Sequence, residues 1–262
     1  MYKRRPIIKA IILAAGEGKR LKKYTNKLPK GMLKFMGETL IEKQINLFKK
    51  IGISDIIIVK GYAQEMINYP DVKYYINEHY NSTNMLVSLF HAENEMDDDL
   101  IISYSDIMFE LKLLEKLISS SYEISILVDV NWKKYWNMRY GSLDFDTESL
   151  EIDKSKIISI GSPNPKINKI DARYIGLLKF TKTGINQVKK IWHKYYDQYY
   201  NKPWQISGKT LKDAYITDIL QALIENGYNV NAVKVNNGWI EFDTDKDYEK
   251  AILWSQTGKL KK

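Results

Sequence analysis

The sequence of 262 residues contains no cysteine and only three histidines, His79, His91 and His193, which are scattered along the chain. Without cysteine, the chain can form no disulfide, no thiolate zinc site and no cysteine nucleophile. Because the histidines are dispersed, we do not expect a histidine-rich metal site. Oxygen ligands are therefore the expected donors for any metal ion.

Long hydrophobic runs are also lacking: no apolar stretch reaches the roughly 18 residues that a membrane helix needs. Residues 1–6 are basic but lead into Ile7-Ile8-Lys9, not into a long apolar segment. We therefore expect no signal peptide, no membrane partner and a cytoplasmic location. No zinc finger, basic zipper or aromatic RNA-binding signature is found, so nucleic acid is not an expected partner. The formal net charge of +8 suits either general solubility or a polyanionic ligand such as a nucleoside triphosphate.

Strand and helix patterns alternate along the chain, which predicts an α/β fold with a Rossmann-like, mostly parallel central sheet flanked by helices. The β-branched apolar runs predict strands at 7–13, 55–59, 72–76, 100–104, 124–128, 175–180, 229–235 and 239–242. The amphipathic segments predict helices or helical turns at 39–50, 61–68, 84–94, 109–119, 183–200, 213–226 and 244–255. No internal repeat or interdomain linker interrupts this pattern, so we expect a single domain spanning residues 1–262.

One segment, 131–174, departs from this alternation. Residues 132–140 are aromatic and basic, and residues 142–170 combine short polar and apolar runs with turn residues clustered at 161–165. Such a pattern predicts antiparallel strands. We expect this segment to form a small inserted lid that binds an acceptor substrate.

A small glycine-bearing loop follows the first predicted strand, at residues 13–21, with Gly16 and Gly18 within it. A strand that enters such a loop leaves N–H groups free to bind phosphate oxygens, and Arg20 and Lys30 can neutralise the charge. The loop is neither a Walker loop nor the dinucleotide fingerprint, because no Gly-Lys-Ser/Thr ends it and Leu21 replaces the third glycine. A plain strand-to-helix turn with solvated cations is the alternative.

The run LAAGEGKRL at 13–21, followed by LPK at 28–30, resembles the signature of the nucleotidyltransferases that make sugar-nucleotides and CDP-alcohols. This resemblance implies a fold of the nucleotide-diphospho-sugar transferase type. It also implies that Arg20 meets the outer phosphates and that Lys30 lies near the phosphorus under attack. The nucleotide-binding residues expected in the loop are Leu13, Ala14, Ala15, Gly16, Glu17 and Gly18.

Phosphoryl transfer from a nucleoside triphosphate generally uses a divalent metal, so carboxylates at strand ends are candidate ligands. Asp106 follows a predicted strand at its carboxyl end, where ligands bind in open parallel sheets, although it also fits the N-cap of the next helix. The same resemblance implies a metal-binding aspartate here, preceded by Ser105 as a nucleotide contact. Mg²⁺ is the expected cofactor.

Glu241 and Asp243 lie two residues apart in a predicted strand, so their side chains share one face. Two acids on one face repel each other unless a cation lies between them. The pattern Trp-x-Glu-x-Asp-Thr at 239–244 is similar to that of choline-phosphate cytidylyltransferases, and this implies that both acids bind magnesium. The alternative is a solvated strand edge, with Asp243 or Thr244 capping the last helix.

The resemblance extends over residues 7–254 and is closest to the bacterial branch with choline-phosphate and phosphonate cytidylyltransferases. It implies that Asn84 and Ser88, which share one helix face, contact the nucleoside. Their alternative roles are an N-cap and a small packing residue. For the acceptor, an aromatic and acidic box would suit a cation, and an arginine would suit a phosphate or phosphonate. The candidate acceptor-binding residues, each of which could equally lie in the core, are Asp129, Trp132, Trp136, Arg139, Tyr174 and Trp239.

These observations predict a cytidylyltransferase that uses CTP and a small phosphomonoester, phosphonate or phosphoramidate, and that releases pyrophosphate. The CDP- or CMP-linked product would serve modification of a cell surface or capsule. One alternative is a nucleotidyltransferase that uses UTP or GTP with a sugar 1-phosphate. Another is a non-catalytic, nucleotide-sensing module on the same fold. A homodimer is left open.

Overall fold

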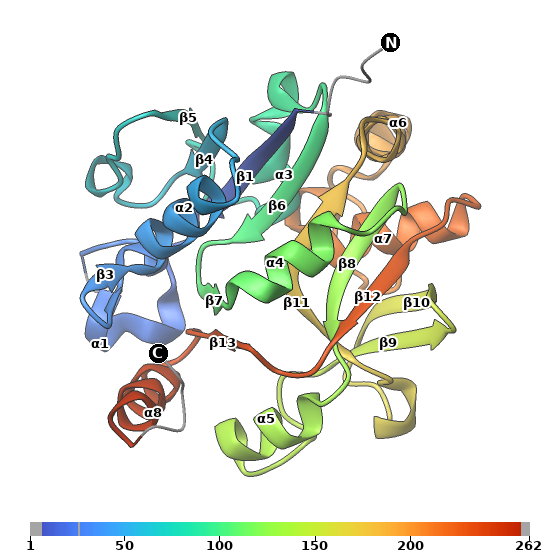
Figure 1. Ribbon diagram of the computed structural model, residues 1–262. Coiled ribbons are helices and arrows are strands. Elements are labelled where there is room, and N and C mark those ends of the chain that lie inside the picture. Colours follow the sequence, from blue (N-terminus) through green and yellow to red (C-terminus); the bar gives the residue numbers. More distant parts are fainter. Residues whose placement is uncertain (1–6, 26, 258–262) are drawn as a thin grey trace.

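The computed structural model describes residues 7–25 and 27–257. Its centre is a nine-stranded mixed sheet in the order β5-β4-β1-β6-β11-β8-β12-β10-β9 (Figure 1). The strands β1, β4, β5 and β6 are mutually parallel, as are β8 and β12, while β11 runs antiparallel to both β6 and β8. The strand bounds, in sheet order, are Val72–Ile76, Ile56–Lys60, Ile8–Ala14, Asp99–Tyr104, Arg173–Phe180, Ile124–Asp129, Asn231–Val235, Lys156–Pro163 and Glu148–Asp153. The predicted α/β class with a mostly parallel sheet is confirmed.

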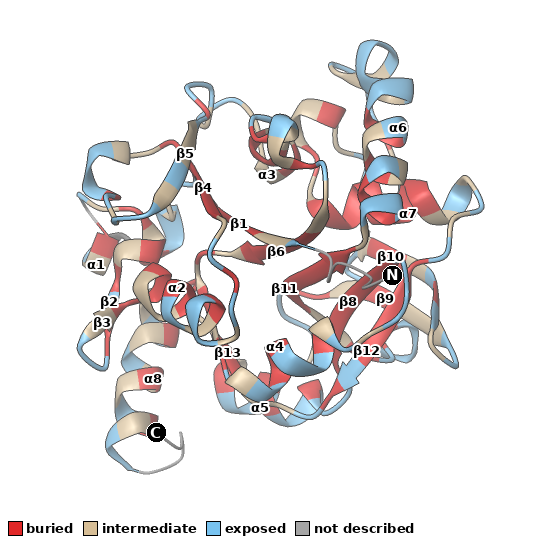
Figure 2. Ribbon diagram, turned by 45° about the horizontal axis from the view of Figure 1, so that its top comes forward, coloured by how far each residue is buried: buried red, intermediate tan, exposed pale blue. Residues whose placement is uncertain are grey.

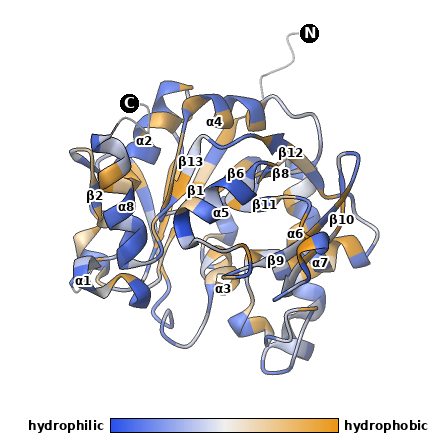
Figure 3. Ribbon diagram, turned by 90° about the horizontal axis from the view of Figure 1, so that it is seen from below, coloured by the Kyte–Doolittle hydropathy of each residue, from blue (hydrophilic) through white to orange (hydrophobic). Residues whose placement is uncertain are grey.

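Alternating residues of β1 contribute to two hydrophobic cores, one on each face of the sheet. Ile12 belongs to the core covered by α2, α4, α5 and α8, whereas Ile11 and Leu13 belong to the core covered by α3, α6 and α7. Figures 2 and 3 show the buried, hydrophobic strands between helices whose outward faces are exposed and hydrophilic. The helix bounds, from α2 to α8, are Leu40–Lys50, Met85–Phe90, Leu111–Ile118, Trp132–Tyr140, Lys182–Tyr199, Ile216–Glu225 and Asp245–Gln256.

Side-chain caps define where several helices begin. Thr39 and Thr244 each form a capping box with the acid three residues on, so α2 and α8 begin directly after them. Asn84 is the N-cap of α3 and accepts a hydrogen bond from Met85 N at 2.8 Å. The helix predicted at 84–94 is therefore present but shorter, because α3 ends at Phe90. No helix in the described part of the chain is long and apolar enough to cross a membrane.

A short antiparallel ribbon joins two segments that lie far apart in the sequence. Strand β7 (Ile107–Phe109) pairs with β13 (Trp239–Glu241), and Phe242 N donates to Asp106 O at 2.9 Å. The helix predicted at 109–119 therefore starts later, because Phe109 belongs to β7, Glu110 is the N-cap and only 111–118 are helical. This ribbon brings the Asp106 turn next to the segment that contains Glu241 and Asp243.

The segment 131–174 does contain antiparallel strands, but they extend the main sheet. Strands β9 and β10 pair with each other, and Lys156 of β10 pairs with Asn231 of β12. Leu150 and Ile160 are almost fully buried, so the pair is anchored in the core on the side of α7. The parts of this segment outside the sheet are α5 and residues 141–147 and 164–172, and the role of 131–174 as an acceptor-binding lid stays a prediction.

Candidate active site

A pocket of about 210 Å³ lies beyond the carboxyl ends of β1 and β6, where open α/β sheets bind their ligands. The glycine loop forms one wall and the Ser105-Asp106 turn another, while the start of α3 closes a third side. Of the predicted nucleotide contacts, Ala14 and Glu17 do not line this pocket. The lining residues are Leu13, Ala15, Gly16, Gly18, Lys30, Tyr80, Thr83, Asn84, Met85, Ser88, Tyr104, Ser105 and Asp106.

Lys30 lies at the centre of the charged groups at the pocket. Its Nζ donates to Asp106 Oδ2 at 2.9 Å and to Asp243 Oδ1 at 2.5 Å. Lys30 opens a 3-10 turn that packs closely on the Asp106 turn, since a Cβ on Gly31 would lie 2.9 Å from Ser105 Cβ. The sequence therefore places this cation through a proline-led turn that only a glycine at position 31 can accommodate.

The glycine loop and Lys30 fit against each other. Gly18 has a φ of +70°, a conformation that L side chains rarely adopt, and a Cβ there would lie 2.4 Å from Lys30 Cγ. The Lys30 side chain thus runs across the loop backbone on its way to the two aspartates. Gly18 is required both for the turn and for this close approach.

The carboxylates hold both active-site cations in their charged forms. Burial alone would lower the pKa of Lys30, but Asp106 and Asp243 raise it above its ordinary value. Burial likewise acts to lower the pKa of Arg20, and Asp243 and Asp146 raise it. Arg20 forms an ion pair with Asp243 and a longer one, 3.5 Å, with Asp146. Asp146 lies in the loop after α5, and its role beside Arg20 was missed from the sequence because no periodic pattern marks that loop.

Glu241 does not join Asp106 and Asp243 around Lys30. It forms an ion pair with Arg139, which also holds Asp247 through two bonds of 2.7 and 2.8 Å. Burial raises the pKa of Glu241, an effect that Arg139 partly offsets and Asp243 reinforces. The three acids predicted to bind metal are thus divided in this structure. Glu241 pairs with Arg139, whereas Asp106 and Asp243 pair with Lys30.

The two aspartates still fit a magnesium ion by the chemistry of their donors. Among residues 7–25 and 27–257, no group of three or more histidines, cysteines, aspartates or glutamates is arranged to hold a metal ion. Magnesium, however, is commonly bound by one or two carboxylates, with phosphate and water oxygens completing the octahedron. Asp106 and Asp243 converge on one cation, the Lys30 ammonium, and so provide such a pair.

Asn84 and Ser88 both line the pocket, but each also has a structural partner. Asn84 caps α3 and donates from Nδ2 to Asp213 O at 3.1 Å. Ser88 Oγ accepts a hydrogen bond from the buried Asn77 at 2.9 Å. Both residues therefore lie where a nucleoside would be bound, and their contact with it stays a prediction.

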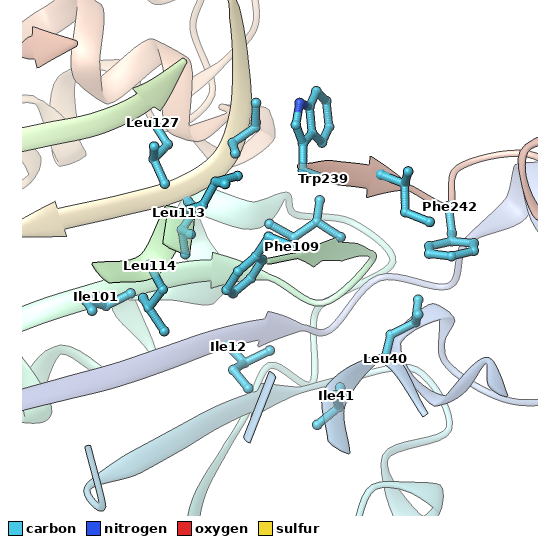
Figure 4. Packing of buried hydrophobic residues seen from close by; sticks show 14 of the residues in the cluster. Ile12, Leu40, Ile41, Ile101, Phe109, Leu113, Leu114, Leu127, Trp239 and Phe242 are labelled. Atoms are coloured by element: carbon cyan, nitrogen blue, oxygen red, sulfur yellow. The ribbon is translucent and has the colours of Figure 1, made fainter. Parts of the chain in front are cut away.

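Most of the predicted acceptor-binding residues lie in the packed interior. Trp132 and Trp136 are fully buried on α5, and Trp239 packs among the core residues shown in Figure 4. Asp129 is fully buried and accepts a hydrogen bond from Trp239 Nε1 at 2.9 Å, as well as from two backbone N–H groups. Arg139 is 3% exposed, with its donors directed at Glu241 and Asp247. These five residues do not form an open aromatic box, because their side chains fill the core under α5.

Tyr174 differs from these five, because it is partly exposed and lies beside the pocket. Its ring meets that of Tyr104 edge to face, with centroids 5.7 Å apart, and Tyr104 lines the pocket. The sequence analysis missed Tyr104, Tyr80, Thr83 and Met85 as lining residues. Tyr104 and Met85 could be found from their positions, since Tyr104 ends a predicted strand and Met85 lies in the first turn of a predicted helix.

The sequence matches the MobA-like NTP transferase domain family over residues 10–139. The chain is 34% identical to the CTP:phosphoglutamine cytidylyltransferase of Campylobacter jejuni over 254 residues, which cover 93% of this chain and 98% of the relative. It is 33% identical to the choline-phosphate cytidylyltransferase of Streptococcus pneumoniae over 150 residues, 56% of this chain and 64% of that one.

Solved structures show the same fold. The CTP:phosphocholine cytidylyltransferase of Streptococcus pneumoniae superposes with a TM-score of 0.70 at 23% identity, covering 94% of this chain and 98% of the other. The fold type implied by the glycine-loop resemblance is thereby confirmed. By its similarity over nearly its whole length, the chain belongs to the cytidylyltransferase branch of the MobA-like NTP transferases, and it is a nucleotidyltransferase.

Proposed function

We propose that this enzyme transfers the cytidylyl group of CTP to a phosphorylated amino acid, with magnesium, and releases pyrophosphate. The observation that carries the proposal is the position of Lys30, which crosses the glycine loop and reaches Asp106 and Asp243 at the edge of one pocket. A phosphate-binding loop, a lysine and two carboxylates are the groups that nucleotidyl transfer from a triphosphate requires.

The nature of the acceptor is supported by a relative that the alignment covers almost completely. That protein is a CTP:phosphoglutamine cytidylyltransferase, and the alignment spans 98% of it. The choline-phosphate relative aligns over 64% of its length. We therefore propose phosphoglutamine, or an amino acid with a similar amide-linked phosphate, as the acceptor.

The reaction would proceed as an in-line displacement at the α-phosphorus of CTP. An oxygen of the acceptor phosphate attacks that phosphorus, the bond to the bridging oxygen of the β-phosphate breaks, and pyrophosphate leaves with the bonding electrons. The attacking oxygen is already ionised at neutral pH, so no general base is needed. Asp106 and Asp243 would hold the magnesium ion, and when bound the ion would neutralise charge on the phosphate oxygens.

Lys30 and Arg20 would each have a distinct part in this reaction. Lys30 would exchange at least one of its ion pairs with the two aspartates for a contact with the α-phosphate, where it would stabilise the developing negative charge. Arg20 is more than half exposed at its side chain, and would exchange Asp243 for the outer phosphates that depart as pyrophosphate. In this proposal the carboxylates hold both cations in place until the triphosphate and its metal arrive.

The test is a pyrophosphate-release screen with purified protein, in which four nucleoside triphosphates are combined with a set of acceptors. The acceptors are phosphoglutamine, choline phosphate, 2-aminoethylphosphonate and hexose 1-phosphates, each with and without Mg²⁺. We expect turnover with CTP and phosphoglutamine, dependent on Mg²⁺ and lost on chelation. Turnover only with UTP or GTP and a hexose 1-phosphate would refute the proposal, and so would the absence of turnover with every pair.

A further inference from the structure

A group of polar side chains on β9, β11 and α7 lies outside the charged centre described above. We call it the β9–β11–α7 cluster, and its members are Glu148, Arg173, Thr217 and Asp218. Three buried atoms in it have no hydrogen-bond partner among the described residues: Arg173 Nε, Thr217 Oγ1 and Asp218 Oδ1. Buried polar atoms in native proteins are nearly always satisfied, so this concentration in one place calls for an explanation.

Thr217 and Asp218 are rigidly placed in the first turn of α7, at 3% and 0% exposure. Asp218 Oδ2 accepts a hydrogen bond from Tyr215 N at 2.8 Å, and this leaves Oδ1 as its second acceptor. Thr217 faces β10, since a Cβ on Gly161 would lie 3.1 Å from Thr217 Cβ. Burial raises the pKa of Asp218, whereas Ser207 and Lys209 lower it, so these two groups also act on its carboxylate. Thr217 Oγ1 and Asp218 Oδ1 remain available as acceptors for a ligand.

Glu148 and Arg173 carry opposite charges near each other but do not form an ion pair with any described residue. Burial raises the pKa of Glu148, and the charge of Arg173 partly offsets this effect. The Arg173 guanidinium lies 4.3 Å from the centre of the Trp136 ring. Glu148 and Arg173 are both partly exposed, and a cation and a carboxylate without an ion-pair partner suit a ligand that carries both a negative and a positive group.

The β9–β11–α7 cluster adjoins the phosphate pocket through Tyr104. Tyr104 lines that pocket, and its ring meets Tyr174, the neighbour of Arg173 on β11. Gly176, with a φ of +80°, allows this arrangement, because a Cβ there would lie 2.7 Å from the Tyr104 ring. The side chains of Tyr104 and Tyr174 thus lie between the phosphate pocket and the part of β11 that carries Arg173.

We propose that the β9–β11–α7 cluster is the subsite for the α-amino acid end of the acceptor. Arg173 binds the α-carboxylate as a planar donor pair, and Glu148 binds the α-ammonium, with Thr217 Oγ1 and Asp218 Oδ1 as further acceptors. This inference rests on the proposed transfer to a phosphorylated amino acid and adds the residues that select it. A quaternary ammonium has no N–H to donate and no carboxylate, so it would leave Arg173 without a partner and be repelled by it.

The experiment compares three acceptors that share the amide-linked phosphate: phosphoglutamine, its analogue without the α-carboxylate and its analogue without the α-amine. Initial rates of pyrophosphate release with CTP are measured for wild type, Arg173→Gln and Glu148→Gln. We expect Arg173→Gln to raise the KM for phosphoglutamine by about tenfold or more, the effect of losing roughly 1.4 kcal/mol of binding. The same variant should leave the KM for the decarboxylated analogue, and that for CTP, within about twofold of wild type. Glu148→Gln should show the corresponding pattern for the deaminated analogue.

Lys169→Gln is the matched control, because Lys169 is an exposed cation near β11 that pairs with Glu151 at 2.8 Å outside the cluster. It should behave as wild type with all three acceptors. The comparison of analogues within one variant does not depend on the folded fraction, so partial unfolding cannot imitate the result. If Arg173→Gln raises the KM of all three acceptors by the same factor, the subsite is refuted. Choline phosphate is measured with wild type as a fourth acceptor, and if wild type prefers it to phosphoglutamine, the subsite fails while cytidylyl transfer stands. If no CTP-dependent turnover is seen, the proposed function itself fails and the subsite with it.

Discussion

Lys30 and Asp243 form an ion pair of 2.5 Å between residues 213 positions apart in the chain. The contact depends on the β7–β13 ribbon, which places the segment after Glu241 beside the turn that contains Asp106. Because Lys30 also reaches Asp106, one ammonium separates two carboxylates that would otherwise repel each other. Lys30 is thus both the centre of the charged network and the group proposed to act on the α-phosphate.

Lys30→Met should therefore lose activity and change the response to magnesium. We expect turnover to fall by roughly 100-fold or more, the usual effect of removing one group that stabilises transition-state charge. The variant leaves Asp106 and Asp243 without their shared cation, so it should also be less stable by up to about 3 kcal/mol. Added Mg²⁺ should raise its melting temperature more than that of wild type, because the ion replaces the missing charge. Equal Mg²⁺ responses in the two proteins would argue against metal binding by this pair.

Gly18→Ala tests whether the loop positions Lys30. A Cβ at this site meets Lys30 Cγ at 2.4 Å and also occupies a left-handed conformation that costs about 1–2 kcal/mol. Gly37→Ala is the matched control, since Gly37 also has a positive φ, +92°, but has nothing within 4 Å of the added Cβ. Both variants should lose stability in a thermal melt, Gly18→Ala at least as much as Gly37→Ala, while only Gly18→Ala should reduce kcat, by about tenfold or more. A similar kcat in the two variants would mean that Lys30 does not depend on Gly18 for its position.

Arg139→Met should act on stability, not on acceptor binding. Arg139 is buried between Glu241 and Asp247, and removing one partner of a buried ion pair costs about 3–5 kcal/mol. Lys23→Met removes an exposed pair with Glu249, which water and salt screen, and should cost far less stability than Arg139→Met. Denaturant unfolding of both variants gives the comparison. An Arg139→Met protein with wild-type stability but a raised acceptor KM would restore the role in acceptor binding that the sequence alone predicted.

The ion pair between Arg139 and Asp247 also predicts that the protein loses stability at acidic pH. Although burial raises the pKa of Asp247, the hydrogen bonds and charge of Arg139 outweigh this effect and lower it overall. The stability that the pair contributes is therefore present above the ordinary aspartate pKa and is lost as the pH falls through the lowered value in the folded state. The difference in unfolding free energy between wild type and Asp247→Asn should shrink toward acidic pH. A difference that does not depend on pH below about 4 would contradict the direction of this pKa.

Most helices and strands could be predicted from the sequence, because the patterns that mark them span only a few neighbouring residues. The helix after Thr39 and the helix after Thr244 begin where their capping residues predict. The position of the glycine loop at the end of β1 likewise followed from a strand and small residues, and its binding of a nucleotide stays a prediction. The β7–β13 ribbon could not be predicted this way, since its pairing joins segments about 130 residues apart and each strand has only three residues.

For the aromatic segment, the sequence alone left both a core role and an acceptor-binding role open. Trp132, Tyr135, Trp136 and Arg139 follow the i, i+3, i+4, i+7 spacing of a helix face, and all four are buried. That spacing predicts a core-facing stripe, which is the signal that the sequence analysis did not use. The core-facing pattern is hard to recognise because its last residue, Arg139, is an arginine, and an arginine is rarely buried without a partner. The partner, Asp247, lies on α8 and is not marked by any local pattern.

Glu148→Gln should separate stability from specificity at the proposed acceptor subsite. Burial raises the pKa of Glu148 above its ordinary value, and Asp218 reinforces this, although Arg173 opposes it. A carboxyl group whose pKa is raised on folding lowers stability as the pH rises, because the unfolded chain releases the proton first. We therefore expect the variant to be more stable than wild type at pH 8 and close to wild type at pH 4, where both carry a neutral side chain. Melting temperatures across this range provide the measurement, and the sign of the difference at pH 8 decides. A variant that is less stable at pH 8 would show that Arg173 stabilises the ionised Glu148 in the free enzyme. The two charged groups would then already be partners, and this would argue against a zwitterionic ligand between them.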